Sequence, residues 1–346
     1  MARKTNRFLE VTEEEISKIN PDNLELINDF LNYLETTDKS SATITVYKSN
    51  LYLFFVYLMN YVKNKDFVNI KKRDIMNWQN YLIKGELSPA RIRNLRASVS
   101  SLSNFIENIL DEEEKWEGFR NIVNKIPAPN ARTIREKTVL EDEQCEKLLD
   151  YLVNNKMYQQ ACAFALAYAS GRRKSELLRI KRSYITDDNL IYGSLYKTPE
   201  KIKTKGRGVG GKMLYVYILK NKFKKYFDLW EDERKRLGVP NEIDEMFVVK
   251  KGNGEWQSAT ISVLDYYTKM FSELLGVDFY FHSLRHNFTT SLSASNIPTN
   301  VIKDLQGWSS IEMVNLYTDS EVDDEIGKYF SEEGIKQVET KGLNDL

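Results

Sequence analysis

The sequence predicts a mainly helical protein with a small antiparallel β-sheet, organised in two domains. A chain of 346 residues exceeds the roughly 150 residues of a typical domain. Apolar residues recur at intervals of three and four through most of it, the spacing that buries one face of a helix. Between residues 190 and 219, short strand-like stretches and a glycine-rich turn indicate a sheet. We therefore expect a helical first domain and an α+β second domain.

The first domain is expected at residues 22–110, between a short polar leader (1–21) and a linker (111–137). Apolar residues at helical spacing predict helices at 24–34, 41–58, 71–82 and 89–109. Ser88 before Pro89 is typical of a helix N-cap and the first helical residue after it. An acidic stretch and a proline-containing segment without helical spacing predict the linker.

The second domain is expected at residues 138–330, followed by a tail at 331–346. Its helices are predicted near 141–152 and at 158–169, 220–236, 258–275, 282–295, 299–305 and 309–317. Its short strands are predicted at 190–196, 200–205, 212–219 and 246–249. The turn before the third strand is rich in glycine and therefore flexible.

Composition excludes several classes of protein. Hydrophobic residues make up 42% and charged residues 29% of the chain, and no apolar run reaches the length of a membrane span. The start lacks the apolar stretch of a secretory signal, which predicts a reducing, cytoplasmic location. The two cysteines, Cys145 and Cys162, have no metal-binding spacing, and Cys162 is expected as a small buried hydrophobe. Because 50 basic residues balance 50 acidic ones, only local basic clusters can bind nucleic acid.

A basic cluster in the first domain is a candidate for contacts with DNA phosphates. The cluster consists of Lys71, Lys72, Arg73, Arg91, Arg93 and Arg96. Its three C-terminal members, all arginines, fall in the first turns of a predicted helix, where the helix dipole favours an anion. A solvated charged face is the competing interpretation, and by itself the more common one. In a chain that binds DNA, phosphate contact becomes the better interpretation.

Two cationic segments of the second domain are further candidates. Arg173 follows a glycine that lets the chain turn, and Glu176 three residues later can pair with its guanidinium. The glycine-rich turn and its flanks carry Lys203, Lys205, Arg207 and Lys212. A lysine at such a position can donate a proton to a leaving oxygen. For either segment taken alone, a solvated basic turn is the more common explanation.

The only two histidines, His282 and His286, lie in one five-residue string with Arg285. Histidines four residues apart on a helix bind zinc in some enzymes, but those enzymes carry a glutamate between them. The arginine found here opposes a metal ion and favours an anion. His286 taken alone can also be a histidine of the core.

Trp308 and Tyr317 complete the candidate residues. The indole N–H of Trp308 can donate to a phosphate oxygen, although a structural role is the alternative. The phenol of Tyr317 can attack a phosphorus atom. Because Tyr168, Tyr280 and Tyr329 compete with it, order and spacing along the chain must decide.

These residues together resemble the motifs of the tyrosine recombinase (phage integrase) family in order and spacing. The matching set is Arg173 with Glu176, a hairpin lysine, His282-x-x-Arg285, Gly307-Trp308 and Tyr317. The resemblance covers residues 138–330, and residues 41–109 resemble the helical core-binding domain of that family through weaker motifs. It implies a SAM-like, DNA-binding core-binding domain followed by a catalytic domain, as in Xer-like and Cre-like recombinases.

The resemblance implies a role for each matched residue. Arg173 and Arg285 would bind the scissile phosphate, while His282 and Trp308 would donate hydrogen bonds to it as negative charge develops. Tyr317 would be the nucleophile that forms a 3′-phosphotyrosine bond.

Proton transfer and support are implied in the same way. Lys205 would protonate the 5′-hydroxyl leaving group, with Lys203 and Lys212 as alternatives. Glu176 and His286 would support the site. No metal or cofactor is implied, since the phosphotyrosine bond conserves the energy for religation.

Three positions depart from the usual family pattern. Ser170 replaces a threonine. Gln306 and Trp308 flank Gly307 where Leu-Gly-His is usual, although tryptophan occurs in active members. The doubled Arg172-Arg173 leaves two registers, of which the one with Arg173 keeps Gly-x-Arg-x-x-Glu.

The implied function is cleavage and rejoining of double-stranded DNA at specific sites, in integration or excision of a phage or mobile element of prokaryotic or viral origin. A homotetramer on DNA and accessory DNA-bending proteins are the expected assembly and partners. The tail stripe of Val322, Ile326, Tyr329 and Phe330 would dock on a neighbouring protomer, with packing on its own protomer as the alternative. The competing functions are a type IB topoisomerase-like enzyme and an inactive DNA-binding relative.

Overall fold

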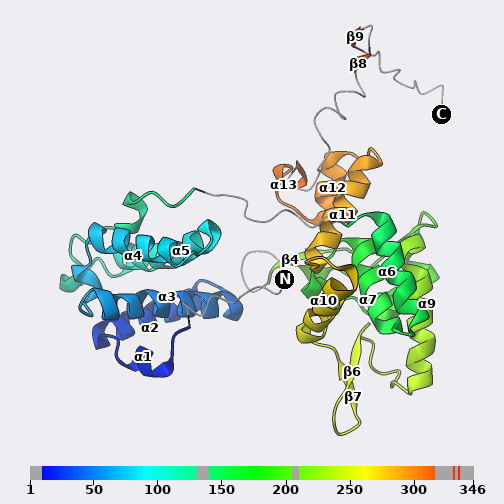
Figure 1. Cartoon of the computed structure of the whole chain (residues 1–346), viewed down its shortest axis with the longest axis horizontal. Coiled ribbons are helices and arrows are strands. Elements are labelled where there is room, and N and C mark those ends of the chain that lie inside the picture. The colour runs from blue at the N-terminus through cyan, green and yellow to red at the C-terminus, as the bar shows by residue number, and fades with distance from the viewer. Residues whose placement is uncertain (1–9, 131–139, 205–209, 316–329, 332–333, 336–346) are drawn as a thin grey trace. The chain divides into compact units, whose positions relative to one another are not determined.

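The structure, a computed structural model, describes residues 10–130, 140–204, 210–315, 330–331 and 334–335. It divides into two compact units, one before and one after the boundary at residues 136–137. Figure 1 shows a helical first unit and a second unit that combines helices with short strands. This architecture confirms the predicted fold class.

The first unit is built from helices α1 (Glu13–Ser17), α2 (Pro21–Thr36), α3 (Ser41–Tyr61), α4 (Lys72–Lys84) and α5 (Pro89–Ile109). Serine side chains cap two of them: the Ser40 hydroxyl accepts from the Thr43 amide at the start of α3. The Ser88 hydroxyl accepts from the Arg91 amide at the start of α5, as predicted. All four helices expected from apolar spacing are present.

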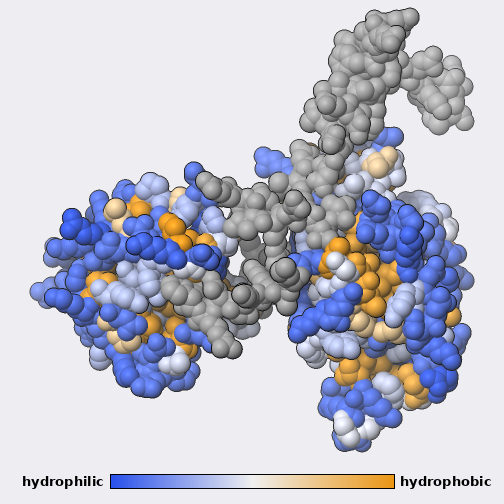
Figure 2. Space-filling view, viewed as in Figure 1, coloured by the Kyte–Doolittle hydropathy of each residue, from blue (hydrophilic) through white to orange (hydrophobic). Residues whose placement is uncertain are grey.

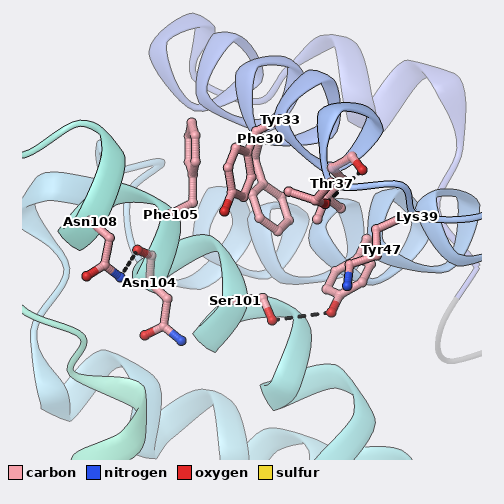
Figure 3. A pocket seen from close by; sticks show the side chains of 10 residues that line it. Phe30, Tyr33, Thr37, Lys39, Tyr47, Ser101, Asn104, Phe105 and Asn108 are labelled. Carbon is pink, nitrogen blue, oxygen red and sulfur yellow. Dashed lines mark hydrogen bonds between the residues drawn. The ribbon is translucent and has the colours of Figure 1, made fainter. Parts of the chain in front are cut away.

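An aromatic cluster fills the junction of α2, α3 and α5. The ring of Phe30 lies 5.7 Å from that of Tyr47 and 5.6 Å from that of Phe105. The rings of Tyr33 and Phe105 are 4.9 Å apart. They line a cavity of about 250 Å³ in which the Tyr47 hydroxyl lies 3.3 Å from that of Ser101 (Figure 3). Because each ring buries a large apolar area, the cluster stabilises the packing of these three helices.

Segments on both sides of this helical core, within the stretches predicted as leader and linker, are packed into it. Ile19, in the predicted leader, is 2% exposed. Trp116 and Val123, in the predicted linker, lie on the short 3-10 helices η3 (Glu114–Trp116) and η4 (Val123–Lys125) and belong to the same core. Single apolar residues in polar segments carry no periodicity, so spacing alone did not reveal their burial.

The second unit is organised around one buried helix. Its helices are α6 (Asp142–Asn154), α7 (Tyr158–Ser170), α8 (Lys174–Leu177), α9 (Lys220–Leu237), α10 (Ile261–Leu275), α11 (Phe281–Ala294), α12 (Thr299–Gln306) and α13 (Glu312–Asn315). Every residue of α7 from Ala161 onward is buried, and the helix packs against α6, α9 and α11. Cys162 is fully buried, as predicted. The apolar character of α7 therefore reflects a position inside the core.

Short antiparallel strands cover part of this core. These pair in the orders β1 (Leu190–Ile191), β2 (Leu195–Lys197), β5 (Tyr217–Leu219); β3 (Ile202–Thr204), β4 (Lys212–Leu214); and β6 (Val248–Lys250), β7 (Trp256–Ser258). A further pair, β8 (Phe330–Ser331) and β9 (Gly334–Ile335), follows nearer the C-terminus. The predicted strand at 190–196 is broken by a turn in which Tyr192 and Gly193 have positive φ angles. The predicted strand at 212–219 divides between two sheets, and β7 was not predicted. The register in the second pair places Lys203 opposite Met213.

The visible surface of both units is mostly hydrophilic, with hydrophobic residues in small patches (Figure 2). Among the described helices, none combines the length and the apolar character that a membrane crossing requires. Within the same residues, no three His, Cys, Asp or Glu side chains gather in a way that could hold a metal ion.

Candidate active site

The candidate site lies where the end of α7, the middle of α11 and the end of α12 meet. Gly171 ends α7 with a φ angle of +60°, in the left-handed region. A Cβ atom at this position would lie 2.7 Å from Nε2 of Gln306 and 2.8 Å from Cδ1 of Phe288. Glycine is therefore required here both for the turn and for the close approach of the other two helices.

Arg285 joins these three segments. Its side chain is fully buried, and Nη1 donates to the Gly171 carbonyl at 2.9 Å while Nη2 donates to the Gln306 carbonyl at 2.8 Å. The guanidinium carbon also lies 4.9 Å from the centre of the Trp308 ring, within cation–π range. One arginine on α11 thus connects residues more than a hundred positions apart in the sequence.

Arg173 is held at the start of α8 by Glu176. Its Nη1 atom lies 2.9 Å from Oε1 of Glu176, and the Glu176 side chain accepts from the Arg173 amide as well. Burial alone raises the pKa of Glu176, but the hydrogen bond and the charge of Arg173 outweigh it, so the pKa lies below its ordinary value. The predicted i to i+3 pair is present, and the Arg173 side chain stays 29% exposed.

The neighbouring arginine has the opposite environment. Arg172 is 1% exposed, and its Nη2 atom donates to the Leu305 carbonyl near the end of α12. Of the two arginines, Arg173 is the one that solvent reaches. The sequence pattern placed Arg172 only as an alternative register and assigned it no role. Arg172 lies in the short link between the buried helix α7 and α8, and the sequence carries no local pattern that separates its burial from the exposure of Arg173.

The end of α12 is closely packed against the strand β4. Gly307 has a φ angle of +70°, and a Cβ atom there would collide with Cδ1 of Leu214. The Lys212 ammonium lies 3.4 Å from the Gly307 carbonyl. Trp308, directly after this turn, is 5% exposed, and its amide donates to the Lys303 carbonyl. Of the two hairpin lysines that the structure describes, Lys203 and Lys212, it is Lys212 that lies at the site.

The two histidines occupy different environments on α11. His282 is exposed, on the turn before Arg285. His286 is 5% exposed, with Nδ1 3.4 Å from the Thr290 hydroxyl. The exposed histidine can reach a ligand in solvent, whereas the buried one faces neighbouring helical residues.

Three predicted site residues, Lys205, Arg207 and Tyr317, lie outside the described residues. So do Val322, Ile326 and Tyr329 of the predicted tail stripe, whereas its fourth member, Phe330, begins β8. Lys203, the alternative to Lys205, is exposed on β3, and its carbonyl accepts from Nη1 of Arg179 at 2.7 Å.

The predicted basic cluster of the first unit is only partly exposed. Lys71, Lys72 and Arg73 are exposed around the start of α4. Arg93 is exposed and donates through Nε to the Pro129 carbonyl at 2.9 Å, whereas the half-buried Arg91 donates to the side chain of Asn50 at 2.7 Å.

Arg96, another member of the predicted basic cluster, is turned inward. It is 6% exposed, and its Nη2 atom donates to the carbonyls of Val123 at 3.0 Å and Ile126 at 2.5 Å. Its Nη1 atom donates to the Gln79 side chain. These bonds direct the guanidinium into the protein, so Arg96 holds the segment after α5 and does not present its charge to solvent.

Comparison with known proteins covers both units. Residues 138–323 match the phage integrase family, and residues 6–116 match the N-terminal SAM-like domain of phage integrases. The SPbeta prophage-derived recombinase-like protein YomM of Bacillus subtilis is 29% identical over 77% of each chain. Tyrosine recombinase XerA of Pyrococcus horikoshii is 25% identical over 86% of this chain and 89% of its own.

Solved structures share the fold. XerH site-specific recombinase, bound to a palindromic difH substrate after cleavage, aligns with a TM-score of 0.64 at 20% identity over 93% of each chain. The Tn1549 transposon integrase in complex with transposon right end DNA aligns with a TM-score of 0.62 at 17% identity, over 88% of this chain and 97% of its own. Since the family match spans more than half of the residues, the chain belongs to the phage integrase family, the tyrosine recombinases.

Proposed function

We propose that this protein is a site-specific recombinase that cleaves and rejoins double-stranded DNA through a 3′-phosphotyrosine intermediate. The observation that carries the proposal is that Arg285 joins Gly171, Gln306 and Trp308 at the meeting point of three helices. Arg173 follows Gly171 by two residues along the chain. Two guanidiniums beside an indole form a donor set suited to a phosphodiester, because planar forks match phosphate oxygens. Family membership supports the same chemistry.

The residues divide the reaction among them. Arg173, oriented by Glu176, and Arg285 bind the scissile phosphate, and His282 and Trp308 donate to its oxygens as charge builds. The Tyr317 phenol loses its proton to water and its oxygen attacks phosphorus, the P–O bond to the 5′-oxygen breaks, and Lys205 protonates that oxygen. Lys203 and Lys212 are the alternative proton donors. Attack of a 5′-hydroxyl on the phosphotyrosine reverses these steps and rejoins the strand.

The division of labour along the chain is part of the proposal. Residues 22–110 form the core-binding domain, and residues 138–330 form the catalytic domain. The relatives favour an intracellular role on DNA: YomM is named as prophage-derived, and lambda integrase aligns as a dimer on a core site. We infer action on a phage or other mobile element, as a tetramer during synapsis, with accessory DNA-bending proteins as partners.

A nicked suicide duplex tests this function. The probes are duplexes taken from the DNA junctions around the encoding gene, each with a nick that lets the cleaved fragment diffuse away. Wild-type protein and Tyr280→Phe should form a covalent protein–DNA complex that resists denaturation, and Tyr317→Phe should form none. A covalent complex with Tyr317→Phe would refute the assigned nucleophile. Relaxation of plasmids without any such junction, by monomeric protein, would instead indicate a topoisomerase.

A further inference from the structure

Three consecutive carbonyls at the end of α12 each receive a cation from a different part of the chain. Arg172 donates to the carbonyl of Leu305, and Arg285 donates to that of Gln306 at 2.8 Å. Lys212 donates to the Gly307 carbonyl at 3.4 Å. The last carbonyls of a helix have no partner within the helix and carry its negative dipole end, so cations stabilise them.

Two of these three cations have another task in the proposed reaction. Arg285 belongs to the proposed phosphate clamp, and Lys212, exposed on β4, is an alternative proton donor. A phosphate that binds Arg285 or Lys212 competes for that side chain with the backbone carbonyl to which it donates in this structure. The turn at 305–308 then loses part of its support at the moment of reaction.

Arg172 has no second task of this kind in the proposed reaction. It is 1% exposed and lies between the buried helix α7 and the start of α8. Burial lowers its pKa to about 10, while the nearby Glu176 carboxylate opposes that shift, so the guanidinium stays charged at neutral pH. A buried charge is costly unless it is bonded, and the bond that the structure gives it across the site is the one to Leu305.

We propose that Arg172 is a positioning residue for DNA cleavage, which holds the turn at 305–308 while Arg285 and Lys212 engage the phosphate. Trp308 is the last residue of this turn, and Tyr317 lies nine residues after Trp308. The hold on Leu305 therefore fixes where the segment with the indole and the nucleophile begins. This inference rests on the proposed function for its effect on cleavage, but not for its effect on the turn.

Hydrogen exchange of the turn gives a readout that does not depend on activity. The Gly307 amide donates to the Asp304 carbonyl and the Trp308 amide to the Lys303 carbonyl, both at 3.0 Å. In full-length Arg172→Leu, these two amides should exchange about 10-fold faster, the effect of losing one hydrogen bond from a charged group. Formation of the covalent complex should slow by about 100-fold, with DNA affinity unchanged.

Arg234→Leu is the matched control. Arg234 is 3% exposed and, like Arg172, donates to backbone carbonyls, those of Ile243 and Glu245, but away from the site. It should show normal exchange at Gly307 and Trp308 and wild-type cleavage. If Arg172→Leu does not fold, Arg172→Lys keeps the charge with a shorter reach, and both effects should be smaller but present.

Two results would overturn the inference. One is wild-type exchange at Gly307 and Trp308 in a folded Arg172 variant. The other is faster exchange there combined with wild-type cleavage. If wild-type protein itself forms no covalent complex, the proposed function fails, while exchange in the variants still decides whether Arg172 holds the turn.

Discussion

Arg96 in the first unit and Arg285 in the second are both buried, and each donates to two backbone carbonyls. Arg96 binds carbonyls of the segment that follows its own helix, at Val123 and Ile126. Arg285 joins two segments that lie 114 and 21 residues away from it and packs beside Trp308. The two arginines are therefore alike in burial and in hydrogen bonding. Only the residues around them distinguish the structural arginine, Arg96, from the candidate catalytic one, Arg285.

The largest expected difference between the two arginines is seen when each is replaced by leucine. Arg285→Leu should reduce formation of the covalent DNA complex by about 1,000-fold, the upper range for loss of one transition-state donor. Arg96→Leu should leave cleavage within a few-fold but lower the free energy of unfolding by about 1–3 kcal/mol, because buried carbonyls lose their donor. Suicide-substrate assays and urea unfolding measure the two effects. Equal cleavage by both variants would remove the distinction.

The arginines of the two units also show which contacts the sequence could predict. Arg173 and Glu176 were predicted to pair because an i to i+3 contact depends only on local helical geometry. The burial of Arg96 and Arg172 depends on carbonyls far along the chain, at Val123 and Leu305, which no local pattern reveals.

Local patterns also explain the outcome for the fold. Long helices with a buried face were predicted closely, since their apolar spacing repeats over many residues. The strands were predicted less well because each has two or three residues, too few for alternation to repeat. The reversal at Tyr192, with a positive φ angle of 53° at a residue other than glycine, is indicated in the sequence by one neighbouring glycine, Gly193.

Two glycines extend the comparison to helix ends. Gly238 and Gly307 end α9 and α12 with φ angles of +68° and +70°, but of the two only Gly307 lies so close to a neighbour, Leu214, that an added Cβ atom would collide. Gly238→Ala should cost about 1 kcal/mol of stability from left-handed strain alone, with normal cleavage. Gly307→Ala should also slow cleavage by about 10- to 100-fold, because the added Cβ atom forces either Leu214 on β4 or the turn itself to shift. Similar cleavage rates for the two variants would show that the close packing is unimportant.

A smaller effect is expected in the pH dependence of stability, which should differ between Glu176 and a surface carboxylate. The pKa of Glu176 lies below its ordinary value, so its stabilisation is complete above about pH 4.3, the usual glutamate pKa, and is lost as pH falls through the lower folded value. The difference in unfolding free energy between wild type and Glu176→Gln should therefore shrink on acidification. Glu143→Gln, which breaks the exposed pair with Lys147, should change stability little at any pH. A constant difference for Glu176→Gln would contradict the pairing.

The smallest expected effect is on the salt dependence of DNA binding, and it compares the exposed with the buried cations of the first unit. Lys71, Lys72 and Arg73 are exposed and can meet backbone phosphates, whereas Arg96 is turned inward. Removing one cation that binds a phosphate should lower the slope of log affinity against log salt by about 1. Glutamine at all three exposed positions should thus flatten the slope by up to about 3 and weaken binding to every duplex alike. Arg96→Leu should leave the slope at its wild-type value, and the opposite pattern would place the DNA-binding surface on another face of the helices.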